Sequence, residues 1–202
     1  MKRRLLLATA LLATAATVPV LAQTAPPTRV RGTIAGLEGN TLTVTSRDGQ
    51  KFEINLKDPV TVRTVKKVEL SSIEPNSYIG TATRTGADGK LTAIEVLVFP
   101  EAMRGAGEGH YAWDLEPGSM MTNGTVKGAV TAAAGRELTI GFKDSSKVVY
   151  VPPEAKIVTF APAAKDDLKP GAKVFCIATK DAEGKLTAPA VTVGKDGVDP
   201  PM

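Results

Sequence analysis

Hydrophobic and polar residues alternate along most of the chain beyond residue 30. In "KFEINL" (51–56) every second residue is apolar, and in "TLTVTS" (41–46) Leu42 and Val44 face one way while the threonines face the other. An alternation with a period of two is typical of antiparallel strands that have one buried face. The body of the chain is therefore predicted to be all-β.

Residue pairs that favour tight turns separate these strands. Gly39-Asn40 and Asp88-Gly89 contain residues that tolerate a positive φ angle, which hairpin turns require. In the first half of the chain the predicted strands cover 30–35, 40–46, 50–56, 60–65, 77–85 and 90–98, with a helical or 3₁₀ turn at 67–73 and its counterpart at 163–168.

The second half of the chain repeats the first. Residues 30–44 align with 126–140 without a gap, and 73–96 align with 168–191 after the loss of one residue. The pentapeptide GKLTA occurs in both halves. Matches this regular indicate two copies of about 70 residues each, which should share one strand order.

The order of the elements favours a small barrel. A meander of strands, broken by one short helix before the last two strands, is typical of the OB type. We therefore predict an all-β fold of two tandem OB-like small β-barrels related by internal duplication. A β-sandwich has the same periodicity and remains an alternative.

Two features of the predicted strands carry specific expectations. Gly32 aligns with Gly128, and both are expected at bulges or close approaches where a Cβ would clash. Pro189 falls inside the last strand of the second copy. It should mark an edge or a bulge, because proline has no N–H to donate to a neighbouring strand.

The first residues have the composition of a secretory signal peptide. A basic "MKRR" precedes an apolar run of about the length expected in a signal peptide, and "VLA" at 20–22 provides a cleavage site after Ala22. A retained membrane anchor is disfavoured because the run is short for a span and is interrupted by Thr9, Thr14 and Pro19. A periplasmic or secreted location is expected. The predicted segments are the signal peptide (1–22), an N-terminal linker (23–29), the first β-repeat (30–99), an ordered inter-repeat linker (100–124), the second β-repeat (125–194) and a C-terminal tail (195–202).

Cleavage removes most of the apparent basicity. The chain has 25 Lys and Arg against 21 Asp and Glu, and Lys2, Arg3 and Arg4 belong to the signal, so the mature chain has 22 against 21. It also has only nine aromatic residues: five Phe, three Tyr and one Trp. A nucleic-acid module needs basic grooves with stacking aromatics, so nucleic acid is not expected as a partner.

The residues for common catalytic chemistry are scarce. His110 is the only histidine, and neither Ser119 nor Cys176 lies in a nucleophile elbow such as G-x-S-x-G. "GAGEGH" lacks the Lys-Ser/Thr that completes a phosphate-binding P-loop. A carboxylate pair for glycan chemistry stays open, since such pairs form in space. We expect the protein not to be an enzyme.

The only cysteine cannot form an internal disulfide. Cys176 lies in "KVFCIAT" beside Val174, Phe175 and Ile177, which are expected to bury it and protect it from thiol reagents. A reactive thiol or an intermolecular bridge is the alternative.

The segment between the repeats holds the only histidine, the only tryptophan and three of the five methionines. Its first interpretation is an ordered crossover in which Tyr111 and Trp113 share a face and cover the seam between the barrels. The same residues offer a patch for a ligand or partner: Phe99, Glu101, Met103, His110, Tyr111, Trp113 and Asp114.

A metal site is the alternative interpretation of this segment. Thioethers with one imidazole suit Cu(I), whereas zinc usually takes several His or Cys ligands. Met120 and Met121 would point in opposite directions in an extended chain, which argues against this hypothesis. Its ligands would be His110, Met103, Met120 and Met121.

The repeated layout "G-x-(I/V)…L-T-(V/I)…(I/L)-x-P-(N/G)…D/E-x-G-K-L-x-A" resembles exported proteobacterial proteins grouped as domain of unknown function 5666. The segment "FPEAMRGAGEGHYAWDLEPGSMMTNGTV" is similar to a tandem-repeat subgroup, and the resemblance covers about 30–194. It implies an envelope location and a β-rich fold, with no established activity. Some similar chains have been labelled metal-transporter permeases, which need several apolar spans that this chain lacks.

The sequence thus predicts an exported, non-catalytic binding or scaffold protein without a cofactor. Its partner would be a protein or small molecule of the cell envelope, and no membrane span should remain after signal removal. The alternatives are a periplasmic protein that handles copper or zinc and, third, a glycan-active enzyme.

Overall fold

The computed structural model describes residues 26–128 and 136–200. The predicted signal peptide and its cleavage site lie outside these residues. The strands are β1 (Thr28–Glu38), β2 (Thr41–Ser46), β3 (Lys51–Lys67), β4 (Tyr78–Thr85), β5 (Leu91–Val98), β6 (Gly109–Ala112), β7 (Met120–Val126), β8 (Glu137–Phe142), β9 (Ser145–Tyr150), β10 (Lys156–Pro162), β11 (Lys173–Lys180) and β12 (Leu186–Val193). The described residues also form the 3₁₀ turns η1 (Leu70–Ser72), η2 (Glu101–Met103) and η4 (Lys165–Asp167).

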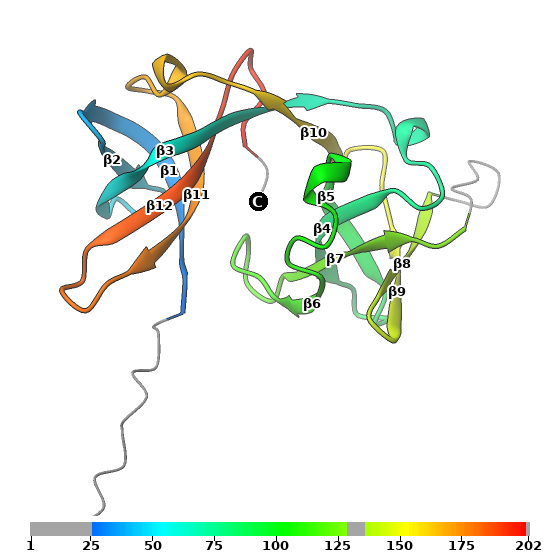
Figure 1. Cartoon of the computed structure of the whole chain (residues 1–202). Helices are drawn as coiled ribbons and strands as arrows, with labels where there is room; N and C mark the ends of the chain where they lie inside the picture. The colour runs from blue at the N-terminus through cyan, green and yellow to red at the C-terminus, as the bar shows by residue number, and fades with distance from the viewer. Residues whose placement is uncertain (1–25, 129–135, 201–202) are drawn as a thin grey trace, which may run out of the picture.

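Strand pairing closes two five-stranded barrels. The first runs β1-β2-β3-β12-β11 and returns to β1, and the second runs β7-β8-β9-β5-β4 and returns to β7 (Figure 1). All neighbours are antiparallel except β3 with β12 and β9 with β5. This order is that of an OB-type barrel, which confirms the predicted fold class and excludes the sandwich.

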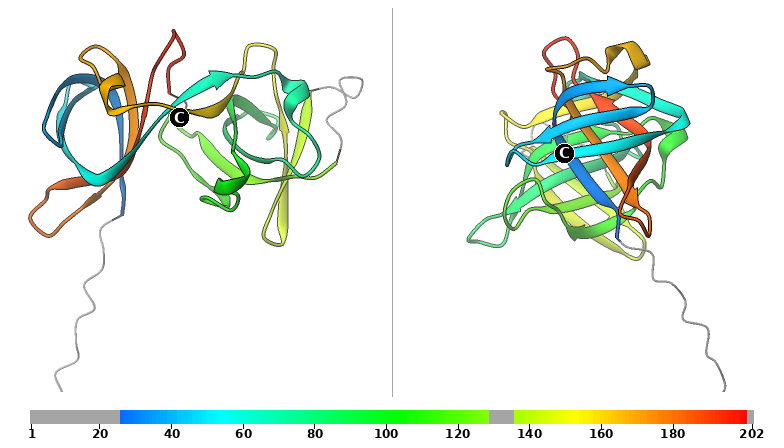
Figure 2. Two further views of the ribbon diagram at one scale, coloured as in Figure 1. Left: turned by 45° about the horizontal axis from the view of Figure 1, so that its top comes forward. Right: turned by 90° about the vertical axis from the view of Figure 1, so that its left-hand side faces the viewer.

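Each barrel is built from both repeats. The first repeat gives β1, β2 and β3 to the first barrel but β4 and β5 to the second, while β11 and β12 come from the second repeat. In Figure 2 the blue and cyan strands accordingly close with the orange and red ones. The predicted ranges 30–99 and 125–194 therefore do not each form a separate barrel.

The exchange follows from the length of β3. The sequence predicted two strands, 50–56 and 60–65, but the structure joins them in one strand of 17 residues. At about 3.3 Å per residue such a strand spans roughly 55 Å. No residue with positive φ interrupts it, so the chain continues from the first barrel towards the second and does not fold back.

The two crossing strands meet about an approximate two-fold axis. The end of β3 pairs antiparallel with β10, and Val65 lies opposite Phe160. These two residues are also equivalent in the two repeats. The equivalence is visible in the barrels, where Ile54 pairs with Leu186 just as Val149 pairs with Leu91.

The glycine expectation holds in part. A Cβ on Gly32 would overlap the carbonyl oxygen of Thr45, so this position is a close approach as predicted. Gly128 has open space around it and a φ of +96°. The structural counterpart of Gly32 is Gly124, whose Cβ would overlap the carbonyl oxygen of Gly141. The ungapped alignment was wrong by four residues at this strand.

Other local expectations can be compared directly. The register of β12 shifts between Ala188 and Ala190, so Pro189 lies at a bulge as predicted. Cys176 is 2% exposed, and burial raises the pKa of its thiol to about 12. Val174 is buried beside it, but Ile177 is 45% exposed, because strand alternation turns it outwards.

Three hydrophobic clusters hold the fold together, one inside each barrel and one at the seam between them. The seam cluster has a buried centre of Val65, Ala82, Leu97, Met121 and Val158, against which Phe99, Tyr111, Trp113, Leu115, Phe160 and Val198 pack. The second barrel, the two crossing strands, the inter-repeat linker and the segment after β12 contribute to it. The relative position of the barrels is therefore fixed by apolar packing.

Candidate ligand cleft at the seam

The inter-repeat linker packs across the seam as predicted. Tyr111 and Trp113 lie on one face of the chain with their ring centroids 6.1 Å apart, edge to face. β6 attaches this segment to β7 of the second barrel. The predicted linker ends earlier than expected, because Met120 already begins β7.

The linker also reaches the first barrel. The guanidinium carbon of Arg29 lies 4.0 Å from the centroid of the Trp113 ring, and that of Arg31 lies 5.3 Å from it. The carboxylate of Asp114 forms ion pairs with Arg31 at 2.9 Å and with Arg29 at 3.9 Å. One tryptophan and one carboxylate thus bind two arginines of β1 (Thr28–Glu38), on the other side of the seam.

Three further residues of the predicted patch have structural contacts. The Phe99 ring packs between Tyr78 and Phe160, at centroid distances of 5.4 and 6.0 Å. Glu101 is exposed and binds Arg104 at 2.6 Å. The sulfur of Met103 accepts a hydrogen bond from Arg63 at 3.6 Å.

His110 lies apart from these residues. Its Nδ1 is 2.8 Å from the hydroxyl of Thr122, and its ring stacks on Phe142 at 6.2 Å. Burial, followed by the charge of Lys147, lowers the pKa of His110. Its neighbour Tyr111 faces the seam, so His110 faces away from it.

The four donors of the metal hypothesis do not gather in one place. Met121 is 2% exposed in the seam cluster, opposite Tyr111 in the strand pair and hence on the other face from His110. Met103 contacts Arg63. Met120 lies in β7 opposite Ala112. Across residues 26–128 and 136–200, no group of three or more His, Cys, Asp or Glu could hold a metal ion.

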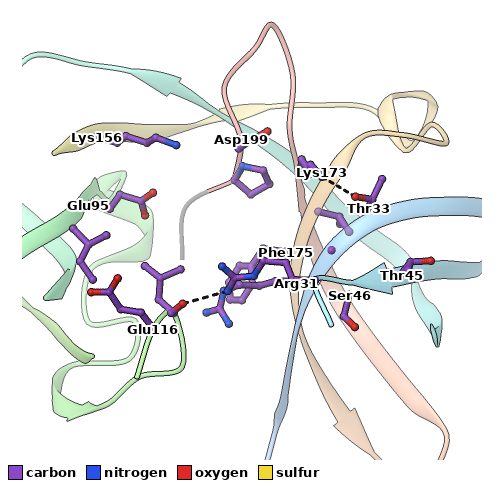
Figure 3. Close-up of a pocket in the computed structure, with 16 residues that line it drawn as sticks. Arg31, Thr33, Thr45, Ser46, Glu95, Glu116, Lys156, Lys173, Phe175 and Asp199 are labelled. Atoms are coloured by element: carbon purple, nitrogen blue, oxygen red, sulfur yellow. Dashed lines mark hydrogen bonds between the residues drawn. The ribbon is translucent and has the colours of Figure 1, made fainter. Parts of the chain in front are cut away.

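The structure instead reveals a cleft of about 720 Å³ at the seam (Figure 3). Arg31, Lys173 and Phe175 of the first barrel line one side, and Glu95 and Glu116 lie across from them. Other residues around it are Gly32, Thr33, Thr45, Ser46, Arg47, Ile94, Leu115, Lys156, Val174, Asp199 and Pro200.

Arg31 is the central cation of this cleft. Its guanidinium carbon is 4.7 Å from the centroid of the Phe175 ring and 5.3 Å from that of the Trp113 ring. Burial lowers the pKa of Arg31, and the carboxylate of Asp114 opposes that effect. Nε and Nη2 have no hydrogen-bond partner within the described part of the chain. Donors of a buried guanidinium without a partner are costly, so an added acceptor would stabilise this group.

Two more cations extend the basic side. The Lys173 ammonium donates to the hydroxyl of Thr33 at 2.9 Å, and Arg47 donates to the carbonyl of Leu115 at 3.3 Å. On the facing side Glu116 binds Arg84 at 2.9 Å. Arg31, Arg47 and Lys173 thus gather on the first barrel and face Glu95 and Glu116, although Lys156 of β10 lies on the side of Glu95 and Asp199 follows β12.

Sequence reasoning missed the basic side of this site. Arg31 and Lys173 lie on outward faces of two strands and Arg47 lies in the turn after β2, all places where charged residues are ordinary. Phe175 carried a usable signal, because it is an aromatic at an outward position of its strand, but it was interpreted as cover for Cys176. Of the predicted patch, Trp113 and Asp114 contact this site through Arg31.

Two further findings bear on what the chain is. Within the described ranges, none of the helical turns is long and apolar enough to cross a membrane. Comparison with known proteins found no match to a family model, a curated protein or a solved structure.

Proposed function

We propose that the chain is an exported binding protein that holds an anionic group of its ligand in the seam cleft, without catalysing a reaction. The observation that carries the proposal is Arg31, which stands between two aromatic rings with two N–H donors that lack a protein partner. A guanidinium fixed in this way is pre-organised for a carboxylate or phosphate oxygen.

The surroundings of the cleft support binding more than chemistry. The cations are held by Asp114, Thr33 and the Leu115 carbonyl, so each has a defined position before a ligand arrives. Fixed positions reduce the ordering cost of binding. His110, the one imidazole, lies on the far face of β6 (Gly109–Ala112) and does not line the cleft.

The metal-handling alternative gains no support from this geometry. A site that used His110 and Met121 together would need donors from opposite faces of one strand pair. Met121 would also have to leave the buried seam cluster. The anionic-ligand proposal requires no such rearrangement.

Export is part of the proposal and rests on the sequence of the first 22 residues. N-terminal sequencing of the protein recovered from its native host tests it directly. A mature chain that begins at Gln23 supports export, and a chain that still begins with the basic "MKRR" segment contradicts it.

Native mass spectrometry of protein purified from its own cell envelope tests the binding function. We expect wild-type protein to carry an added ligand mass. The double variant Arg47→Glu, Lys173→Glu should lose that mass, because it reverses the charge on the basic side of the cleft. Lys143→Glu is the matched control, since Lys143 holds the position equivalent to Arg47 in the other barrel, and it should keep the ligand.

Thermal melts of the three proteins show whether the variants are folded. A ligand mass that persists in a folded double variant contradicts the proposal. So does wild-type protein that carries no added mass and shows no rise in Tm with an extract of the cell envelope.

A further inference from the structure

We propose that the ligand of the seam cleft is a short polypeptide segment that presents one acidic side chain. This inference rests on the proposed function and specifies its ligand. It comes from a comparison of the outer faces of the two barrels, which occupy equivalent positions in the fold.

The equivalence is fixed by strand register. On the first barrel Arg31 pairs with Phe175 and Thr33 with Lys173. On the second barrel the matching pairs are Asn123 with Gly80 and Thr125 with Tyr78. Between them lie Gly32 and Gly124, the two close-approach glycines. The same patch of outer barrel surface therefore exists twice.

On the second barrel this patch is occupied by the chain itself. The carbonyl of Ala106 accepts hydrogen bonds from the hydroxyl of Tyr78 at 3.1 Å and from the amide of Asn123 at 3.2 Å. Two residues later, a carboxylate oxygen of Glu108 accepts the backbone N–H of Lys143 at 2.8 Å. The patch thus binds a turn of the linker through one carbonyl and one carboxylate.

Each patch has one aromatic ring at its edge, but the ring comes from a different segment of the fold in the two barrels. Gly80 leaves room for Phe99, whose ring lies 3.0 Å from where a Cβ of Gly80 would stand. At the equivalent positions the first barrel has Phe175 and Gly194. Each patch therefore keeps one ring at its edge, and the first barrel supplies its own without using the chain that follows β12 (Leu186–Val193).

The first barrel carries stronger donors at the peptide-binding positions. Arg31 replaces Asn123, and Lys173 replaces Tyr78. Arg47 stands at the position of Lys143, which binds Glu108 through its backbone N–H, so only the first two replacements exchange a neutral donor for a charged one. Charged donors form stronger hydrogen bonds to carbonyl and carboxylate oxygens than neutral ones do. The open cleft therefore suits a segment like the linker, and its charged donors would bind the oxygen acceptors of that segment more strongly.

The facing side of the cleft limits how much negative charge a ligand can carry. Glu116 and Asp199 both line it. These carboxylates would repel a dense polyanion such as nucleic acid or polyphosphate. A chain that is neutral apart from one carboxylate satisfies the basic side without meeting this repulsion, and a polypeptide has that character.

The test uses the mature protein and a peptide with the sequence of residues 105–109, GAGEG, acetylated and amidated so that its glutamate is the sole charge. A titration followed by ¹⁵N–¹H NMR reports both affinity and location. We expect the amide signals of Arg31, Lys173 and Phe175 to shift, while those of Tyr78 and Asn123 stay in place because the linker already covers them.

Matched changes sharpen the test. Peptide with Gln for Glu should bind about tenfold more weakly, since a charge-assisted hydrogen bond is lost. Lys173→Met and Arg47→Gln should each lower the affinity for the original peptide by a similar factor, about tenfold. Lys143→Gln should leave the affinity within about twofold, which is the change expected for an independent site.

The outcomes separate this inference from the proposed function. If the peptide does not bind, binds equally well with Gln, or loses affinity in Lys143→Gln, the inference is overturned. If the native ligand mass still depends on Arg47 and Lys173, the proposed function stands nonetheless. If tripolyphosphate displaces the peptide at a concentration below that of the peptide itself, the inference is likewise overturned, and the ligand is a polyanion and not a polypeptide.

Discussion

The two barrels have one strand order but differ in what covers their outer seam faces. On the second barrel, Tyr78 and Asn123 hold the linker at Ala106, so this face is part of the protein's own packing. On the first barrel, the equivalent Lys173 and Arg31 line an open cleft. The same scaffold position therefore serves stability in one copy and is available for binding in the other.

The exchange of strands makes the two barrels depend on each other. Because β4 and β5 of the first repeat close the second barrel, neither repeat contains a complete sheet. A two-domain chain with separate barrels would tolerate the loss of one of them. In this arrangement, the loss of either repeat should leave both barrels incomplete.

The largest effect should come from separating the repeats. A fragment of residues 26–104 should not fold as a monomer, since its strands would expose unpaired edges. Mixing it with a fragment of residues 105–200 should restore a one-to-one complex with the circular dichroism of the full chain. Analytical ultracentrifugation measures the assembly. A cooperative melt from either monomeric fragment would contradict the exchanged topology.

Truncation of the seam tryptophan should be the next largest effect. Trp113→Ala removes a ring that packs on Tyr111 and two arginines. We expect the free energy of unfolding to fall by about 3 kcal/mol, the lower end of the usual range for such a truncation, because the ring is only half-buried. Thermal or urea unfolding measures it. His110→Ala is the control and should change stability much less, so a larger loss in that variant would argue against the seam as the main inter-barrel contact.

The close-approach glycines sharpen the equivalence of the barrels. Gly32→Ala and Gly124→Ala should each destabilise the protein by about 1–3 kcal/mol, because the new Cβ would push against a backbone carbonyl. Gly128→Ala should cost only about 1 kcal/mol, the usual penalty of a side chain at positive φ. Urea unfolding of the three variants distinguishes the two registers. If the Gly32 and Gly128 variants lose equal stability and the Gly124 variant loses none, the ungapped alignment is correct after all.

The smallest effect concerns His110. Its pKa is lowered in the folded protein, so the unfolded chain takes up a proton at higher pH than the folded chain. Its contribution to stability is therefore complete above the unfolded value of 6.5 and is lost as the pH falls below it. Melts of wild type and His110→Gln at pH 7.5 and pH 5 measure the difference. An equal loss in both proteins would assign the pH dependence to other groups.

Local pattern was enough to predict most of the strands, the OB-type barrels and the buried Cys176. Each of these depends on neighbours in sequence: alternation decides which residues face inwards, and turn residues decide where strands end. The bulge at Pro189 follows from a missing N–H in the same way. Trp113 and Tyr111 were also assigned correctly to the seam, since both rings lie on one face of an extended segment.

Only the tertiary structure decided which strands close which barrel. A strand that turns back and a strand that continues have the same alternation, so Lys51–Lys67 could not be distinguished from two strands by pattern. Register across a long loop is equally invisible, which is why Gly128 was matched in place of Gly124. The cleft depends on both, because Arg31 and Phe175 become neighbours only when the second repeat pairs with β1 of the first. Sequence determines each strand's faces, whereas the partners of those faces are set by packing between segments far apart in the chain.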